Sequence, residues 1–263
     1  MKPEIVTWEP QRASQNETVL FVHGIYHDAS GWDAFARYFA ERGYGCRALI
    51  LRGHGSDPDG ASLRNARFAD YLQDLRFALA ELDEAPILIG HSLGGLLIQK
   101  LIEVDHAPAP AVVLISTPTP RSLRRAFWLL LRRFPRPALR MLLTLNPEHI
   151  YKDPVIVRKL FFSDTPDTPA IQQALGRILA QPESRRIFFD VMLLNMRAPA
   201  RKTPTLVLGG AADYAIGMDA FEATARLHNV RPVVLPGAPH DLMLYREWER
   251  AATLIVDWLE WKR

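Results

Sequence analysis

A serine between two glycines, at the end of an apolar run, is the residue best placed to act as a nucleophile. The pentapeptide Gly90-His91-Ser92-Leu93-Gly94 follows the apolar segment 86–89 and precedes a segment with helical spacing of its apolar residues. A serine on such a sharp strand-to-helix turn presents its hydroxyl above a sheet, and the glycines remove Cβ atoms that would collide there. The amide N–H groups at the start of the helix face any negative charge near the serine. This context favours a nucleophilic Ser92 over an ordinary glycine-rich turn.

A serine hydroxyl needs a base that accepts its proton, and the sequence contains eight histidines. His240 lies in a loop after the last predicted strand, where it would reach the carboxyl edge of a sheet. His91 adjoins the serine, but neighbouring side chains on a tight turn diverge. His106 and His228 fall near or within helical segments, and His149 falls in a proline-rich insert. We therefore expect His240 to be the base rather than an exposed loop histidine.

The base in turn needs a carboxylate that orients its ring. Asp213 follows the predicted strand 205–208 and a glycine pair, which places it at the same sheet edge as His240. Asp219 is the nearest rival but falls inside the next predicted helix, and Asp241 adjoins the histidine too closely to bridge its ring. A turn or helix N-cap aspartate is the structural alternative for Asp213. We expect Asp213 to complete a catalytic triad.

The chain order nucleophile, acid, histidine is the order found in the α/β-hydrolase fold. With the turn around Ser92, the sequence resembles the serine-nucleophile branch of that superfamily over the whole chain outside residues 118–200. The segment 23–25, with the sequence His-Gly-Ile, resembles the oxyanion loop of the family. The resemblance implies that the backbone N–H groups of Ile25 and Leu93 hold the oxyanion. Each such donor stabilises a transition state by about 2.7–4 kcal/mol.

A second segment resembles lysophospholipases and monoacylglycerol-lipase-like esterases of this superfamily. Arg52-Gly53-His54-Gly55-Ser56 is similar to their R-G-x-G-x-S segment, which shapes a loop near the site and implies no catalytic role for His54. A serine at position 92, instead of an aspartate, separates the chain from haloalkane dehalogenases and epoxide hydrolases of this fold.

Motifs for other chemistries are missing from the sequence. There is no H-E-x-x-H and no clustered His/Cys spacing that would predict a zinc site. The glycines at 90–95 lack the Lys-Ser/Thr of a phosphate-binding P-loop. We therefore expect neither a metal nor a cofactor.

Short apolar runs alternate with helical patterns along the chain, which predicts βα units and a mostly parallel sheet. The predicted strands are 18–22, 47–51, 86–90, 111–116, 205–208 and 232–235, and the main predicted helices are 32–42, 68–82, 93–104 and 245–261. Because the strands are continuously apolar, we expect helices on both faces of the sheet. Residues 4–8 are expected to add an antiparallel edge strand. The predicted fold class is α/β.

The alternation breaks between residues 116 and 205, where about ninety residues stand in place of an ordinary crossover. This insert is rich in proline and otherwise has the pattern of several short helices. We expect residues 118–200 to form a helical cap, inserted into a hydrolase core made of residues 1–117 and 201–263.

The first part of the insert is strongly basic. Residues 121–143 carry seven arginines and no acidic residue around the apolar run 127–131. The favoured interpretation is a cap helix whose apolar side covers the active site while its arginines face solvent. The alternative is that this helix contacts an anionic membrane surface or a lipid headgroup. Phe127 and Trp128 are candidates for lining an acyl-binding pocket.

Composition narrows the class of protein. Of the 263 residues, 48% are hydrophobic and 23% charged, which is typical of globular domains and argues against disorder. A net charge of +3 is too small to predict nucleic-acid binding, and the single cysteine, Cys46, excludes an intramolecular disulfide. The N-terminus lacks an apolar signal segment and no apolar run approaches eighteen residues, so we expect a cytoplasmic protein without a membrane span.

The expected reaction is hydrolysis of a small-molecule carboxylic ester with an apolar acyl group. An acyltransferase or thioesterase would use the same triad and differ in the acceptor or leaving group. An aminopeptidase would need an acidic or polar anchor for a substrate amine, which the arginine-rich segment disfavours. A non-catalytic ligand receptor of this fold would usually have lost a triad residue, whereas all three candidates are present.

Overall fold

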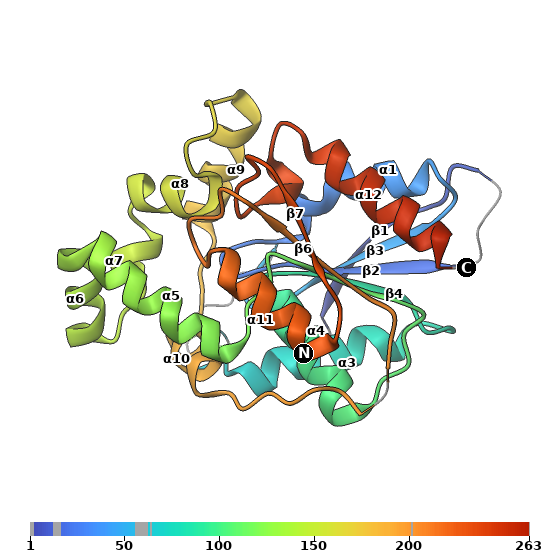
Figure 1. Ribbon diagram of the computed structural model, residues 1–263, viewed down its shortest axis with the longest axis horizontal. Coiled ribbons are helices and arrows are strands. Elements are labelled where there is room, and N and C mark those ends of the chain that lie inside the picture. Colours follow the sequence, from blue (N-terminus) through green and yellow to red (C-terminus); the bar gives the residue numbers. More distant parts are fainter. Residues whose placement is uncertain (1–2, 13–16, 56–62, 64, 201, 263) are drawn as a thin grey trace.

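The fold has a central sheet with helices on both sides and a separate group of helices at one end (Figure 1). The computed structural model describes residues 3–12, 17–55, 63, 65–200 and 202–262, and Ser56 of the Arg52 segment lies outside them. The group at the end runs from α5 (Pro120–Arg133) to α10 (Arg185–Leu193). The predicted α/β class, with a mostly parallel sheet and helices on both faces, is confirmed.

Within the described residues the sheet has seven strands, in the order β1-β3-β2-β4-β5-β6-β7. Their bounds are β1 Glu4–Trp8, β2 Thr18–Val22, β3 Gly45–Ile50, β4 Ile87–His91, β5 Val112–Ile115, β6 Thr205–Gly210 and β7 Pro232–Leu235. The edge strand β1 pairs with β3 in the antiparallel sense, as expected, and every other pair is parallel. The loops after β2, β4, β6 and β7 therefore leave the same edge of the sheet, where α/β folds form their ligand sites.

Alternating side chains of the strands build two separate hydrophobic layers. Val19 and Phe21 of β2 face α1 (Asp33–Ala40) and α12 (Trp248–Trp261). Leu20 and Val22 face the other layer, which contains α3 (Phe68–Ala80), α4 (Leu93–Asp105) and α11 (Met218–His228). Successive side chains of a strand point to opposite faces, so a strand covered on both sides must be apolar throughout.

Proline positions explain where most of the inserted helices begin. Pro120, Pro135, Pro154 and Pro169 each stand in the first turn of a helix, where the missing N–H costs no hydrogen bond. The helices of the insert after α5 are α6 Pro135–Thr144, α7 Glu148–Tyr151, α8 Pro154–Phe162, α9 Pro169–Ala180 and α10 Arg185–Leu193. The side chains of Thr119, Asp153, Thr168 and Ser184 cap α5, α8, α9 and α10.

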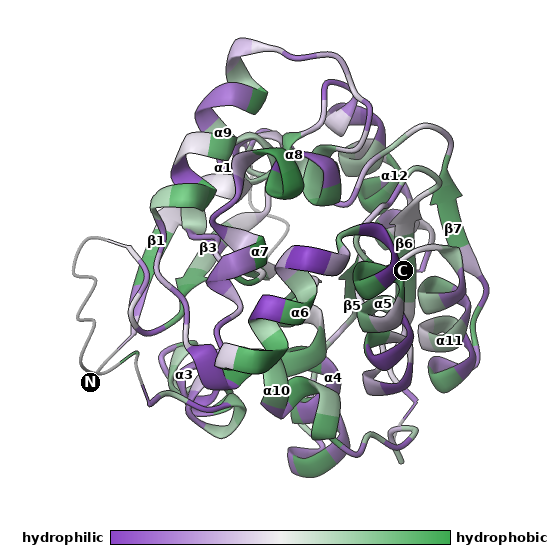
Figure 2. Ribbon diagram, turned by 90° about the vertical axis from the view of Figure 1, so that its left-hand side faces the viewer, coloured by the Kyte–Doolittle hydropathy of each residue, from purple (hydrophilic) through white to green (hydrophobic). Residues whose placement is uncertain are grey.

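The inserted helices, called the cap below, have their own hydrophobic core. It contains Leu130, Met141, Ile150 and Phe161, and Tyr26 of the loop after β2 packs into it. Figure 2 views the molecule from the cap side, with α5, α6, α7 and α10 toward the viewer. None of the described helices is long and apolar enough to cross a membrane.

Candidate active site

Ser92 occupies a strained turn between β4 and α4. Its φ is +49° and its ψ is −111°, a conformation that costs energy in any residue other than glycine. The backbone N–H of Ser92 donates to the carbonyl oxygen of Ile115, 3.0 Å away on β5, and so anchors the turn to the sheet. A Cβ at Gly94 would collide with the carbonyl oxygen of Val22, so only glycine lets α4 pack this closely on β2. The local structure is the one expected of a nucleophile turn.

His240 and Asp213 form a direct pair at the same edge of the sheet. Nδ1 of His240 lies 2.7 Å from Oδ2 of Asp213, and both residues are buried. The second carboxylate oxygen of Asp213 accepts the N–H groups of Ala215 at 2.8 Å and Ile216 at 3.0 Å. This carboxylate is therefore held in place by its own loop while it orients the imidazole ring.

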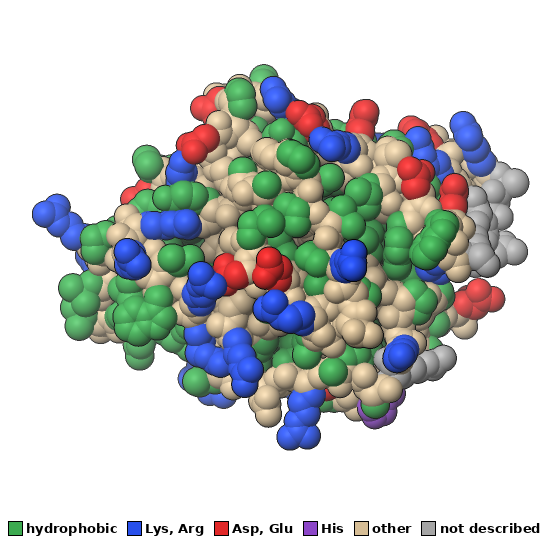
Figure 3. All heavy atoms as spheres, in the orientation of Figure 1, with side chains coloured by type: hydrophobic (Ala, Val, Ile, Leu, Met, Phe, Trp, Pro, Cys, Tyr) green, Lys and Arg blue, Asp and Glu red, His purple; other side chains and the backbone are tan. Residues whose placement is uncertain are grey.

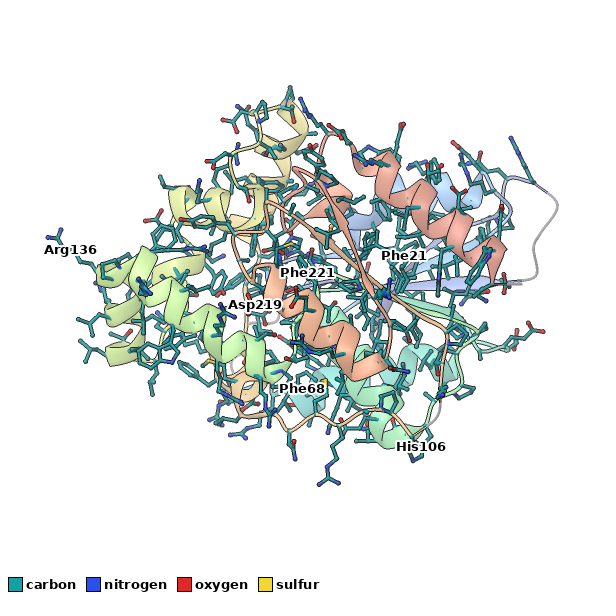
Figure 4. All side chains as sticks on the ribbon, viewed as in Figure 1. Phe21, Phe68, His106, Arg136, Asp219 and Phe221 are labelled. Atoms are coloured by element: carbon teal, nitrogen blue, oxygen red, sulfur yellow. The ribbon has the colours of Figure 1, made fainter. Side chains whose placement is uncertain are left out.

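The rival aspartates of the sequence lie elsewhere. Asp219 is on α11 and pairs with Arg125 of the cap at 2.8 Å (Figure 4). Asp241 pairs with His27 at 3.0 Å, whereas Nδ1 of His240 is bonded to Asp213. Among the rival histidines, His106 ends α4 on the lower side of the molecule, far from the cap in Figure 4.

The environment of His240 favours its charged form. Burial lowers the pKa of this imidazole, but the negative charge of Asp213 and its hydrogen bond outweigh burial, so the net pKa lies above the ordinary 6.5. A proton accepted by His240 during a reaction is stabilised by the same pair.

His91 contacts the backbone of the loop that carries His240. Its side chain is buried, and Nε2 lies 3.2 Å from the carbonyl oxygen of His240. The hydroxyl of Ser116 donates to the same oxygen at 2.8 Å. Burial, reinforced by the neighbouring His240, lowers the pKa of His91 well below its ordinary value, so this ring is neutral. As expected, it points away from Ser92 and does not line the cavity described below.

The predicted oxyanion residues, Ile25 and Leu93, lie next to the turn that carries Ser92. A Cβ built at Gly24 would lie 3.2 Å from Cβ of Ser92, which shows how closely the loop after β2 approaches the turn. Ile25 and Leu93 both line the cavity that contains Ser92. Leu93 is the first residue of α4, so its N–H has no acceptor within the helix.

A largely apolar cavity lies between the core and the cap. Ser92, His240, Ile25 and Leu93 form part of its core side. The cap contributes a mostly apolar wall, which includes Leu123, Ala126, Phe127, Leu130, Tyr151, Leu160, Phe161, Ile187, Phe188, Val191 and Met192. Of the two aromatic residues expected to bind substrate, Phe127 lines the cavity. Trp128 does not: it is 66% exposed on the outer side of α5.

Glu183 of the cap was not singled out by the sequence, yet it contacts the loop after β2 directly. Its Oε2 accepts the N–H of Tyr26 at 3.2 Å, and its Oε1 accepts the Tyr71 hydroxyl at 2.5 Å. Nε2 of His54 lies 3.4 Å from Oε2. Burial raises the pKa of Glu183 and lowers that of His54, but their mutual attraction and hydrogen bonds reverse both shifts. The pair is therefore charged. Only His54, inside the Arg52 motif, carried a sequence signal.

Three side chains in this region could bring ligand atoms together for a metal. Atoms of His91, His240 and Asp241 lie within 4.8 Å of one another. One ring nitrogen of each histidine is already engaged: Nε2 of His91 lies 3.2 Å from the carbonyl oxygen of His240, and Nδ1 of His240 lies 2.7 Å from Asp213. We therefore interpret this trio as hydrogen-bonded support for the histidine loop.

Comparison with known proteins found a family match over most of the chain. The profile described as "Alpha/beta hydrolase family" matches residues 19–254. The chain is 32% identical over 122 residues to a non-heme chloroperoxidase of Burkholderia pyrrocinia, covering 44% of this chain and 42% of that protein. It is 32% identical over 97 residues to a pyrethroid hydrolase of Sphingobium wenxiniae, covering 37% and 34%. These matches span less than half the length of either relative.

Solved structures share the fold over nearly the whole chain. An esterase of Thermogutta terrifontis has a TM-score of 0.74 and 20% identity, covering 98% of this chain and 93% of that one. A monoacylglycerol lipase of Paleococcus ferrophilus has a TM-score of 0.67 and 21% identity, covering 98% of both chains.

Proposed function

Because this chain belongs to the alpha/beta hydrolase family, we propose that it is a serine hydrolase that cleaves a carboxylic ester with an apolar acyl group. The observation that carries the proposal is the His240–Asp213 pair at 2.7 Å, with His240 and Ser92 both lining one largely apolar cavity. A relative described as a pyrethroid hydrolase and a structural neighbour described as an esterase support hydrolysis as the reaction.

In the proposed acylation step, His240 accepts the proton of the Ser92 hydroxyl as Oγ attacks the ester carbonyl carbon. Negative charge develops on the carbonyl oxygen, next to the backbone N–H groups of Ile25 and Leu93. Asp213 stabilises the imidazolium. His240 then gives its proton to the leaving oxygen as the ester C–O bond breaks. The alcohol leaves, and the acyl group remains on Ser92 inside the cap cavity.

In the deacylation step, His240 removes a proton from a water molecule, which attacks the acyl carbon of the Ser92 ester. The same N–H groups hold the second oxyanion. The bond to Oγ of Ser92 breaks and Oγ recovers the proton from His240, which releases the carboxylic acid and regenerates the enzyme. The apolar wall of the cap favours an acyl group without charge.

Hydrolysis of p-nitrophenyl esters from acetate to palmitate by the wild-type protein and by Ser92→Ala tests the proposal. We expect wild-type turnover to fall by about 10⁴-fold or more in the variant, with unchanged circular dichroism. The chain-length optimum would measure the depth of the cavity. A folded wild-type protein with no turnover on any ester would refute the esterase assignment.

Acyl transfer and thioester hydrolysis use the same residues and are distinguished by their products. The acyl-enzyme on Ser92 reacts with water in a hydrolase and with an alcohol in a transferase. Adding alcohols to the ester assay and measuring the new ester against free acid separates these two reactions. An acyl-thioester substrate series compared at equal chain length separates a thioesterase from an esterase.

A further inference from the structure

The outer side of α5 and α6 exposes several large apolar side chains. Trp128 is 66% exposed, Leu139 54%, Leu143 78% and Leu145 61%. We call these four residues, together with Arg132, Arg136 and Arg140, the cap-tip surface. Trp128 is on α5, Leu139 and Leu143 are on α6, and Leu145 is the residue that ends α6. Isolated exposed apolar residues are ordinary, but a group of large ones is typical of an interaction surface.

The two helices that carry this surface are basic and contain no acidic residue. The segment 118–147 contains seven arginines and no Asp or Glu: Arg121, Arg124, Arg125, Arg132, Arg133, Arg136 and Arg140. Arg125 pairs with Asp219, while Arg124 and Arg133 donate to backbone carbonyl oxygens. In the described part of the chain, no carboxylate lies within ion-pair distance of Arg132, Arg136 or Arg140. Their positive charge is therefore not neutralised by the protein itself.

Helical spacing interleaves the apolar and basic side chains. On α5, Trp128 lies one turn from both Arg124 and Arg132; on α6, Leu139 and Leu143 are one turn apart, beside Arg136 and Arg140. Figure 3 shows hydrophobic and basic side chains next to one another at the cap end of the molecule. Figure 4 shows Arg136 projecting outward beyond this end.

We propose that the cap-tip surface docks onto an anionic lipid bilayer. Tryptophan and leucine side chains enter the boundary between headgroups and acyl chains, while arginines beside them bind the anionic headgroups. A second copy of the chain is a poor partner, because a symmetric contact would bring two sets of unneutralised arginines together. Docking uses no residue of the Ser92 site. It also brings the active site close to lipid, because α5 lines the cavity with Phe127 and Leu130 on its other side.

Vesicle binding by the 263-residue chain with Ser92→Ala tests the proposal without hydrolysis of the lipid. We expect co-sedimentation with vesicles of equimolar phosphatidylcholine and phosphatidylglycerol, weaker binding to phosphatidylcholine alone, and release by sodium chloride. Brominated lipid in the mixed vesicles should quench tryptophan fluorescence. That quenching should be lost in Trp128→Phe and kept in Trp261→Phe, which alters an even more exposed tryptophan at the end of α12.

A charge variant with a matched control locates the surface. Arg132→Gln, Arg136→Gln and Arg140→Gln together should lower the partition coefficient by about two orders of magnitude, or about fivefold per arginine. Arg12→Gln, Arg231→Gln and Arg250→Gln together remove the same charge from exposed sites outside the cap and should leave binding unchanged.

Three outcomes would overturn the proposal. The first is a folded protein that does not bind anionic vesicles. The second is an equal loss of binding in the two triple variants. A concentration-dependent dimer that is abolished by Trp128→Ser with Leu143→Ser would instead make the surface an interface between copies. None of these results bears on ester hydrolysis, and an inactive Ser92 site would leave the binding result intact.

Discussion

His27 and Asp241 form a buried pair that joins the loop after β2 to the loop that carries His240. Nε2 of His27 lies 3.0 Å from Oδ2 of Asp241, and its Nδ1 lies 2.6 Å from the carbonyl oxygen of Ile25. Burial lowers the pKa of His27, but the charge of Asp241 and its hydrogen bond give a net rise. Both ring nitrogens therefore donate. The N–H of Asp241 also donates to the carbonyl oxygen of Phe161, 3.0 Å away, at the end of the cap helix α8.

Replacing Asp241 with asparagine should destabilise the protein and slow ester hydrolysis. The substitution leaves the buried His27 without its counter-charge, which costs about 3–5 kcal/mol of unfolding free energy in a buried pair. Urea unfolding at neutral pH measures this loss, and kcat for a p-nitrophenyl ester measures the effect on the site. The control is Asp33→Asn, which breaks the exposed pair with Arg37 and should cost less than about 1 kcal/mol. Equal losses in the two variants would contradict this role of Asp241.

Asp213→Asn should lower kcat by about 10⁴-fold while the protein stays folded, because an amide cannot hold the ring in the reactive tautomer. Its remaining oxygen can still accept the N–H groups of Ala215 and Ile216, so the loop should keep its shape. Asp219→Asn serves as the control, since Asp219 pairs with Arg125 outside the cavity. If Asp219→Asn were the inactive variant, the acid of the triad would be misassigned.

The pH dependence of ester hydrolysis should reflect the raised pKa of His240. The free enzyme needs a neutral imidazole to accept the Ser92 proton, so kcat/KM should rise with pH through an apparent pKa above 6.5. Removing the negative charge with Asp213→Asn should move this acid limb to lower pH. Measuring kcat/KM from weakly acidic to weakly alkaline pH tests both shifts. An apparent pKa at or below 6.5 for the wild type would show that burial affects His240 more strongly than Asp213 does.

Gly24→Ala should impair ester hydrolysis by crowding the turn that carries Ser92, the proposed nucleophile. The added Cβ would lie 2.9 Å from Nδ1 of His91 and 3.2 Å from Cβ of Ser92, both too close for an ordinary contact. Overpacking of this kind costs about 1–3 kcal/mol, and a displacement of about 1 Å at a reacting group costs about 10²-fold in rate. Gly31→Ala is the matched control, because no atom lies within 4 Å of the Cβ it would add. Comparable kcat values in the two variants would argue against a tight contact at Gly24.

Glu183→Gln should weaken the link between the cap and the oxyanion loop in a pH-dependent way. The folded state lowers the pKa of Glu183 below 4.5, so its contribution is present above pH 4.5 and is lost as pH falls. The folded state raises the pKa of His54 above 6.5, so that contribution is complete below pH 6.5 and is lost as pH rises through the folded pKa. The stability difference between wild type and variant should therefore be largest between pH 4.5 and 6.5.

Urea unfolding across this range measures the effect of Glu183. The control is Glu148→Gln, whose carboxylate forms an exposed pair with Arg185 and should show little pH-dependent difference. In the ester assay, Glu183→Gln should lower kcat more than it raises KM, because the N–H of Tyr26 adjoins Ile25, the proposed oxyanion donor. A change in stability alone would assign Glu183 to folding and not to the site.

Local patterns in the sequence were sufficient to predict the strands of the sheet and the turn at Ser92. Continuous apolar runs predicted the parallel strands, and the Gly90–Gly94 pattern predicted the turn at Ser92. Both depend on interactions within a few residues, so they can be read along the chain. The helix-starting prolines of the insert are equally local, because the proline ring itself fixes φ.

Only the tertiary structure decided which distant polar groups meet. Asp213, Asp219 and Asp241 all follow the end of β6 or β7 in the sequence. Asp219 forms an ion pair with Arg125 because α11 packs against the cap. Glu183 and Tyr26 are 157 residues apart, and His27 and Asp241 are 214 apart. No periodic pattern in the sequence predicts such contacts, because they form only when elements far apart in the chain pack around the same buried space. The same holds for Trp128: an apolar run on a helix does not show which of its members faces outward until the neighbouring helices cover the rest.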